Sequence, residues 1–194
     1  MRQLCFFSAE VSQPRLADLA GVLCGQGQLV SFGRTAARLS VVLAEEWRAR
    51  LLADACAERH VHAEVTTSEE GHPLVRTAFR ADLIELATAW TKGAVKAVPP
   101  TLRLDGQALR LWALTGGDWT HGGYVLPFDS RAPDTHEPLV AALANIGLRG
   151  TQLGVRAGGP GLRLTGRRKL NRLAELVGPA PNAAEPHWPL RPAS

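Results

Sequence analysis

The chain repeats itself. One order of predicted helices and strands fills the first half and begins again roughly 90 residues later. Several apolar positions recur at that offset: Leu83, Leu86 and Ala87 return as Leu170, Leu173 and Ala174, and Val65 returns as Val155. A half of this size buries only a thin core, so the two halves are expected to pair and complete each other's core.

Apolar periodicity and turn residues predict the elements of each half. In the first half we expect helices over 14–24, 45–60 and 82–90, and strands over 28–33, 37–44, 61–67 and 73–79. In the second half we expect helices over 107–117, 137–147 and 168–178, a hairpin over 118–130, and strands over 151–157 and 161–166. Each half therefore reads αββαββα, which predicts an α+β fold of two similar halves about a pseudo-twofold axis.

Composition divides the chain into four segments. The halves span 1–90 and 101–178, and residues 91–100 between them have two prolines, two lysines and no periodicity, as a linker does. Residues 179–194 are rich in Pro and Ala, which predicts a flexible tail in which Trp188 could dock.

Charge and cysteine content narrow the class of protein. The 22 Lys and Arg against 18 Asp and Glu give a net charge of +4, which permits a polyanionic partner without requiring one. Cys5, Cys24 and Cys56 form no CxxC pair and are odd in number, as is typical of buried thiols in a reducing compartment. With no long apolar run and no signal-peptide pattern at the N-terminus, we expect a soluble cytoplasmic protein.

Two nine-residue stretches carry a resemblance to a known family. The stretch "LAGVLCGQG" at 19–27 resembles the motif of the LAGLIDADG homing endonucleases, and "LRLWALTGG" at 109–117 resembles the second motif copy of their single-chain members. The resemblance extends over roughly residues 15–178. It implies that the two motif helices pack together, with Ala20, Gly21 and Gly25 at their crossing, and that two curved antiparallel sheets form a saddle.

The chemistry of that family depends on the last acidic residue of each motif copy. The two carboxylates bind divalent metal beside the scissile phosphates, because Mg²⁺ prefers anionic oxygen ligands. Here these positions are Gln26 and Gly116, and neither supplies a charge. Asp118 is the one nearby acid that could substitute. We therefore expect no catalytic site, no metal and no cofactor, with Mg²⁺ required only if the chain is an active endonuclease.

The resemblance also implies that one face of each sheet reads bases in the DNA major groove. Alternation along the strands predicts the outward-facing polar residues. They are Arg38, Ser40, His62, Thr66 and Arg76 in the first half, and Gln152, Arg156, Arg163 and Thr165 in the second. The alternative is an ordinary solvated sheet face, since outward positions are polar in most sheets.

Basic residues outside the strands are candidates for phosphate contacts. They are Arg34, Lys92, Lys96, Arg149 and the cluster Arg167, Arg168 and Lys169, which lies where a helix begins. The alternative for the cluster is a solvated run of charges. His60, His62 and His72 lack a third ligand at zinc spacing, so no metal is expected there, and Trp112 is expected in the core.

The sequence thus favours a monomeric nucleic-acid-binding protein, with duplex DNA preferred over RNA, that has lost metal-dependent cleavage. Three alternatives stay open. The chain could be an active endonuclease using Asp118, an RNA-binding maturase or splicing-type factor, or an assembly protein that keeps only the fold.

Overall fold

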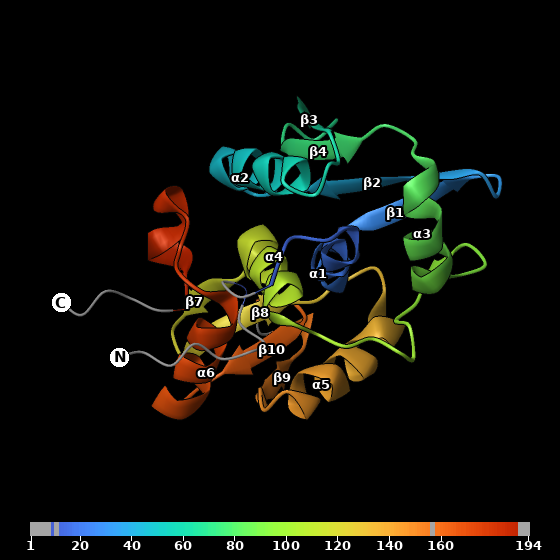
Figure 1. The fold of residues 1–194 in the computed structure, drawn as a ribbon. Coiled ribbons are helices and arrows are strands. Elements are labelled where there is room, and N and C mark those ends of the chain that lie inside the picture. Colours follow the sequence, from blue (N-terminus) through green and yellow to red (C-terminus); the bar gives the residue numbers. More distant parts are fainter. Residues whose placement is uncertain (1–8, 10–11, 156–157, 190–194) are drawn as a thin grey trace.

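The two halves have the same order of elements (Figure 1). The computed structural model describes residues 9, 12–155 and 158–189. The N-terminal half contains η1 (Leu16–Leu19), α1 (Ala20–Cys24), β1 (Gln28–Phe32), β2 (Ala36–Val42), α2 (Glu46–Ala57), β3 (Ala63–Thr67), β4 (Pro73–Thr77), η2 (Ala81–Leu83) and α3 (Ile84–Trp90), where η denotes a 3₁₀ helix. The C-terminal half contains α4 (Gly106–Gly116), β7 (Asp118–Thr120), β8 (Gly123–Pro127), η3 (Pro133–Thr135), α5 (His136–Asn145), β9 (Thr151–Leu153), β10 (Gly161–Leu164) and α6 (Arg167–Val177). The predicted duplication and α+β class are confirmed.

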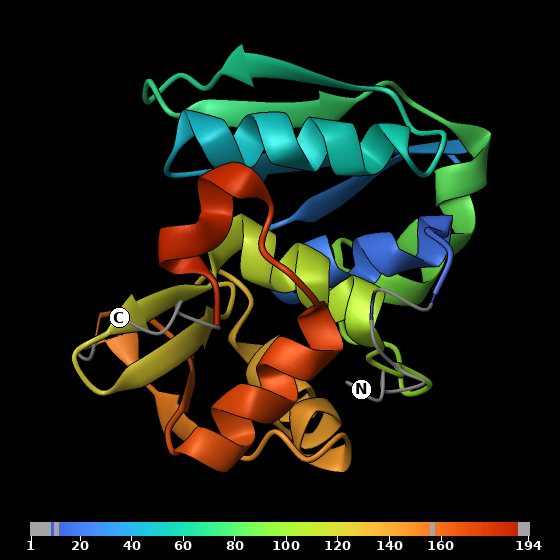
Figure 2. The same cartoon turned by 60° about the vertical axis from the view of Figure 1, so that its left-hand side comes forward.

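Each half forms one antiparallel sheet of four strands. The strand order is β1-β2-β4-β3 in the N-terminal sheet and β7-β8-β10-β9 in the C-terminal sheet, so the central strands correspond between halves. The two sheets lie on opposite sides of α1 and α4, which run through the middle of the molecule (Figures 1 and 2). The motif helices therefore join two separately hydrogen-bonded layers.

Alternation of side chains along the strands separates a buried from an outer face. In β2, Ala37, Leu39 and Val41 are buried while the residues between them are partly exposed. In the C-terminal sheet, Leu126 on β8 pairs with Leu162 on β10, and both are fully buried. We call the opposite side of each sheet its outer face.

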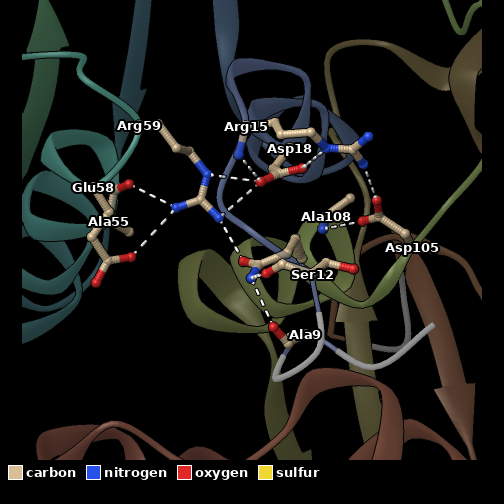
Figure 3. Close-up of polar contacts among 10 residues, drawn as sticks. Ala9, Ser12, Arg15, Asp18, Ala55, Glu58, Arg59, Asp105 and Ala108 are labelled. Carbon is tan, nitrogen blue, oxygen red and sulfur yellow. Dashed lines mark hydrogen bonds and ion pairs between the residues drawn. The ribbon is translucent and has the colours of Figure 1, made fainter. Parts of the chain in front are cut away.

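A polar network, buried at Arg59, Asp18 and Gln107, fixes the N-terminal ends of the two motif helices (Figure 3). The Arg59 guanidinium, which follows α2, donates to a carboxylate oxygen of Asp18 at 3.1 Å and to the amide oxygen of Gln107 on α4 at 2.6 Å. Arg15 pairs with Asp105 at 2.8 Å, and Asp105 caps α4 by accepting from the backbone N–H of Ala108. Burial raises the pKa of Asp18, although Arg59 and the Arg15 N–H oppose that shift.

The segment between the halves is partly structured. Residues 91–100 contain a two-stranded hairpin of β5 (Thr91–Lys92) and β6 (Val95–Lys96). Lys92 is exposed on this hairpin, whereas the Lys96 side chain turns inward and is only 8% exposed. The hairpin therefore delivers one lysine to the interior.

The predicted flexible tail is wrong for residues 179–189. This segment forms η5 (Asn182–His187), and Trp188 is 1% exposed. The Trp188 indole N–H donates to the carbonyl of Gly178, and its own carbonyl accepts from the indole N–H of Trp119 at 2.8 Å. Burial of one large aromatic ring holds a stretch whose Pro and Ala content indicated no regular structure. Residues 190–194 lie outside the described residues.

The cysteines and the absence of a membrane-spanning helix were also predicted from the sequence. Cys24 and Cys56 are free and buried, and burial raises the pKa of the Cys56 thiol to about 11. Cys5 lies outside the described residues. No helix within the described ranges is long and apolar enough to cross a bilayer.

Candidate nucleic-acid interface

The two motif helices cross at Gly21. A Cβ atom on this residue would lie 1.9 Å from the carbonyl oxygen of Ala108, so the backbones touch where only glycine fits. Ala20 is buried beside it, and Gly25 lies at the C-terminal end of α1, where a Cβ would stand 3.7 Å from the Trp112 ring. The structure thus brings together the residues expected at the crossing, and places Trp112 in the core.

The two positions that carry acids in the resembled motif lie at the C-terminal ends of α1 and α4. Gln26 is exposed just beyond α1. Gly116 ends α4, and a Cβ on it would approach Cγ of Pro127 to 2.6 Å. The first position therefore offers a neutral amide, and the second has no room for a side chain.

Lys96 occupies the end of α1. Its ammonium donates to the carbonyl oxygens of Gly25 and Gly27 at 2.6 and 2.8 Å, and to Asp129 Oδ2 at 3.1 Å. Burial lowers the pKa of Lys96, while the Asp129 carboxylate opposes that shift. Burial alone would raise the pKa of Asp129, but Lys96, the Arg131 N–H and Gln28 together hold it below its ordinary value. The expectation that Lys96 contacts phosphate from the surface is therefore wrong, because its ammonium group is buried.

Arg48 occupies the end of α4 in the same manner. Its guanidinium donates to the carbonyl oxygens of Leu114 at 2.7 Å and Gly117 at 3.1 Å, and to Glu45 Oε2 at 2.6 Å. A cation at a helix C-terminus is favourable because the unpaired carbonyls carry partial negative charge. Each motif helix thus ends against a buried cation that the protein itself supplies.

Asp118 lies beside these groups without forming a cation site. One carboxylate oxygen is 3.0 Å from Nδ1 of His187 and accepts from the backbone N–H of Trp119, and the other is 4.0 Å from the Arg48 guanidinium. Among the described residues, no group of three His, Cys, Asp or Glu side chains is placed to hold a metal ion. His60, His62 and His72 accordingly form no such group either. The two motif positions, Gln26 and Gly116, therefore supply no carboxylate of their own.

A cavity of about 790 Å³ opens where the two motif helices end, and we call it the helix-end cavity. Gln26, Gly116 and Asp118 line it, together with Arg131 and the buried Arg48. Its wall also includes the carboxylates Glu45, Glu69 and Glu70. The wall thus carries four carboxylates and two arginines, so acids outnumber cations around this cavity.

On the N-terminal sheet, the predicted polar residues share the outer face. Ser40 on β2 pairs with Arg76 on β4, and Arg76 pairs in turn with Glu64 on β3. Arg38 lies two residues before Ser40 on β2 and therefore on the same side. Thr66 and His62 lie two residues on either side of Glu64 and are exposed. Outward alternation was sufficient to predict this face.

On the C-terminal sheet the prediction holds for one strand and fails for the other. Arg163 on β10 pairs with Val125 and with Thr151, on the side away from Leu162. Gln152, on the edge strand β9, is exposed as expected, but it pairs with Leu162 and so lies on the side of that buried residue and not on the side of Arg163. A period of two means that a one-residue error in phase reverses every side chain on a strand. Thr165 lies two residues after Arg163 and is exposed, whereas Arg156 lies outside the described residues.

A second cavity, of about 830 Å³, lies between the end of α5 and the start of α6, and we call it the basic cavity. Arg149, Arg167, Arg168 and Lys169 line it, with Arg172 and its partner Glu175. The structure therefore gathers into one hollow the basic residues proposed as phosphate contacts in this half. Arg34 lies far along the chain from them, exposed in the turn between β1 and β2.

Comparison with known proteins defines the fold. No family model matches the sequence, and no curated protein matches it either. The homing endonuclease I-WcaI, solved bound to its DNA recognition sequence, aligns over 91% of this chain and 83% of its own, with a TM-score of 0.62 and 14% identity. The N-terminal LAGLIDADG domain of DUF199/WhiA aligns over 87% and 84%, with a TM-score of 0.55 and 14% identity. The chain has a LAGLIDADG-like fold. The expected resemblance is thereby confirmed at the level of architecture.

Sequence reasoning missed Arg48 and Asp129, and it placed Lys96 at the surface. A basic residue in an amphipathic helix or a linker looks solvent-exposed, and no local pattern marks it as buried. One signal was available: the last carbonyl groups of a helix have no donor within the helix, and the glycines at both ends have no side chain to supply one, so donors from another part of the chain were to be expected.

Proposed function

We propose that the chain is a monomeric nucleic-acid-binding protein that takes duplex DNA against the outer faces of its two sheets, without a divalent metal and without cutting it. The observation that carries this proposal is the occurrence of outward arginines in both sheets: Arg38 and Arg76 in one, and Arg163 in the other. The structural neighbour I-WcaI was solved with its DNA recognition sequence, which supports DNA as the first choice.

The outer faces suit the edges of base pairs. A sheet ribbon fits the width of the major groove, and arginine makes two parallel hydrogen bonds to guanine. Glu64, directly opposite Arg76, offers a carboxylate that can accept from the amino group of cytosine. Ser40 and Thr66 add hydroxyl groups on the same face. This mixture of residues can distinguish bases as well as attract phosphates.

Phosphate contacts come from the periphery of the molecule. Arg34 on the β1–β2 turn and the basic cavity carry cations, whereas the wall of the helix-end cavity carries carboxylates. We infer that the duplex is held at the ends of the sheets and that its backbone stays away from the acidic centre. Each neutralised phosphate releases a counterion, so affinity should fall steeply with salt.

The loss of cleavage is supported by the two helix ends. Gln26 and Gly116 provide no carboxylate, and the carbonyl oxygens at the two helix ends already accept hydrogen bonds from Lys96 and Arg48. A divalent cation prefers anionic oxygen ligands, and neither motif position supplies one. Asp118, engaged with His187, does not remedy this.

A binding experiment tests the proposal. Sequences selected from a random duplex pool are titrated with wild-type protein, Arg76→Ala and Arg163→Ala at several salt concentrations. Each variant should bind its selected duplex about 5- to 150-fold more weakly, the range for one lost bidentate base contact of ~1–3 kcal/mol. Arg50→Ala, which removes an exposed arginine from α2, is the matched control and should bind as wild type.

Two further arms separate the alternatives. Incubation of the bound duplex with Mg²⁺ or Mn²⁺ should produce no nick, and a metal-dependent nick would identify an active endonuclease. Preference for a structured RNA over every selected duplex would favour the maturase type. Failure to bind any nucleic acid at low salt would overturn the proposal and leave an assembly role.

A further inference from the structure

Three apolar side chains are exposed together at one end of the N-terminal sheet, on its outer face. Phe32 is 69% exposed, Phe79 is 43% exposed and Val30 is 46% exposed. The two phenylalanine rings lie 5.8 Å apart between centroids. We call these three residues the aromatic patch. It lies beside the β1–β2 turn, which Figure 1 shows at the end of the sheet beyond α3.

An irregularity in the sheet turns Phe79 outward. Val41 pairs with Val75, so regular pairing would place Phe79 opposite the buried Ala37. Instead Ala37 pairs with Arg80, which means that one extra residue has entered this strand, as in a β-bulge. The hydroxyl of Thr77 accepts from the Leu39 N–H at 3.1 Å and so satisfies the donor that the extra residue displaces. The bulge takes a large apolar ring out of the core and presents it to solvent.

The patch is flanked by cations. The Arg38 guanidinium carbon lies 4.7 Å from the centroid of the Phe79 ring, and Arg34 is exposed in the adjoining turn. No Asp or Glu occurs between Asp18 and Glu45, so β1, β2 and their turn are free of negative charge. Arg38 has no carboxylate partner among the residues that the structure describes. The nearest acid that follows Phe79 in the chain, Asp82, is paired with Arg80. An apolar surface with Arg34 and Arg38 at its edge matches a ligand with an aromatic face and an anionic linkage.

We propose that the aromatic patch is a stacking platform for an unpaired base adjoining the duplex. This inference rests on the proposed function and specifies its ligand: a duplex with a single-stranded extension or a displaced base. Inside a duplex the flat faces of the bases are covered by their neighbours, and only an unpaired base or a duplex end offers one to a phenylalanine ring. Stacking on aromatic side chains and arginine is the usual way in which proteins hold unpaired bases.

The experiment compares two probes that share one duplex. The first is closed at both ends by hairpin loops bridged with abasic linkers, and the second carries short thymine tails at both ends. Wild-type protein should bind the tailed probe more tightly. Phe32→Ala and Phe79→Ala should each bind the tailed probe roughly 5- to 150-fold more weakly than wild type, which is the effect of one lost base stack. Both variants should bind the closed probe as wild type does.

Two control variants accompany them. Val95→Ala trims an exposed apolar residue outside the patch and should leave both affinities unchanged. Phe32→Tyr keeps the ring and should retain tail binding. Thermal melting of each variant verifies that it folds, which is expected because Phe32 is mostly exposed.

The outcomes distinguish the two proposals. Equal binding of both probes, unaffected by the phenylalanine variants, would overturn the stacking platform and leave duplex binding intact. A wild-type dimer that Phe32→Ala converts to a monomer would show that the patch is an interface between copies, which also overturns it. If neither probe binds, the proposed function fails and this inference fails with it.

Discussion

Lys96 and Arg48 each supply positive charge to the C-terminal end of a motif helix. Both lie against carbonyl groups at the end of a motif helix, and Lys96 also joins three parts of the chain: the end of α1, the hairpin of β5 and β6, and Asp129 after β8. A buried ion pair is weak evidence for stability in itself, but removing one partner leaves the other charge uncompensated. Lys96 should therefore be far more sensitive to substitution than the lysine next to it in the hairpin.

Lys96→Met is expected to lower the free energy of unfolding by about 3–5 kcal/mol, because Asp129 would stay buried without its cation. Lys92→Met is the matched control, since Lys92 is exposed on the same hairpin, and it should change stability by less than about 0.5 kcal/mol. Chemical denaturation measures both. Similar losses in the two variants would mean that the ion pair contributes nothing specific.

Asp129 should make stability sensitive to acid. Its folded-state pKa lies below the ordinary value of 3.8, so below that pH the unfolded chain takes up a proton more readily than the folded chain. The stability that the carboxylate contributes is therefore present near neutral pH and lost as the pH falls below 3.8. The difference in unfolding free energy between wild type and Asp129→Asn should shrink over that range. Asp18 has a raised pKa and shifts stability in the opposite sense, but it is present in both proteins and cancels. A difference that stays constant with pH would contradict this assignment.

Strand alternation predicted the outer face of the N-terminal sheet because five consecutive strand residues or more fix the phase. It failed at Gln152 because β9 is only three residues long, too short for its pattern to define which side is buried. Lys96 and Arg48 could not be predicted, since their partners are backbone carbonyls that belong to distant elements. Local pattern thus identifies exposed contact residues better than buried cations.

At the scale of elements, the crossing of α1 and α4 depends on backbone contact. Gly21→Ala places a methyl group 1.9 Å from the Ala108 carbonyl oxygen, and the helices must separate to accept it. We expect a loss of about 3 kcal/mol or more, at the upper end of overpacking effects. Gly154→Ala, where a Cβ meets open space, should change stability by less than about 0.5 kcal/mol. Thermal unfolding of both variants tests this, and an undestabilised Gly21→Ala would show that the helices are not so tightly packed.

The segment that contains η5 should behave as part of the core. Trp188→Ala removes a buried indole and its hydrogen bond to Gly178, so the free energy of unfolding should fall by about 3–5 kcal/mol. Glu185→Ala, at an exposed position of the same segment, should have an effect below about 0.5 kcal/mol. If denaturation curves of Trp188→Ala and wild type coincide, the segment does not stabilise the C-terminal half.

The order and type of the main elements followed from the sequence because each amphipathic pattern recurs in both halves, and one copy supports the other. The structure of the tail could not be predicted, because Trp119 and Tyr124 of the C-terminal sheet donate hydrogen bonds to the carbonyls of Trp188 and His187, and only the tertiary arrangement brings them together. The hairpin of β5 and β6 could not be predicted either, because a strand of two residues is too short to show an alternating pattern.

At the scale of the whole molecule, the pseudo-twofold arrangement is symmetric in backbone and asymmetric in charge. The aromatic patch belongs to the N-terminal half and the basic cavity to the C-terminal half, while the shared centre carries dispersed carboxylates. A ligand held at both ends would therefore contact two different surfaces, one apolar with few cations and one strongly basic. The salt dependence of binding should consequently come mainly from the C-terminal half.

The double variant Arg167→Ala with Arg168→Ala measures that contribution. Each lost phosphate contact on a duplex lowers the slope of log affinity against log salt by about 0.9, so the slope should fall by up to about 1.8 while the selected sequence preference is kept. The control pair Arg50→Ala with Arg103→Ala removes the same net charge from exposed positions outside the basic cavity and should leave the slope unchanged. Equal slopes in all three proteins would mean that the duplex does not reach the basic cavity. Equal reductions in both variants would mean that only net charge matters, since the field of the whole molecule responds to any lost cation.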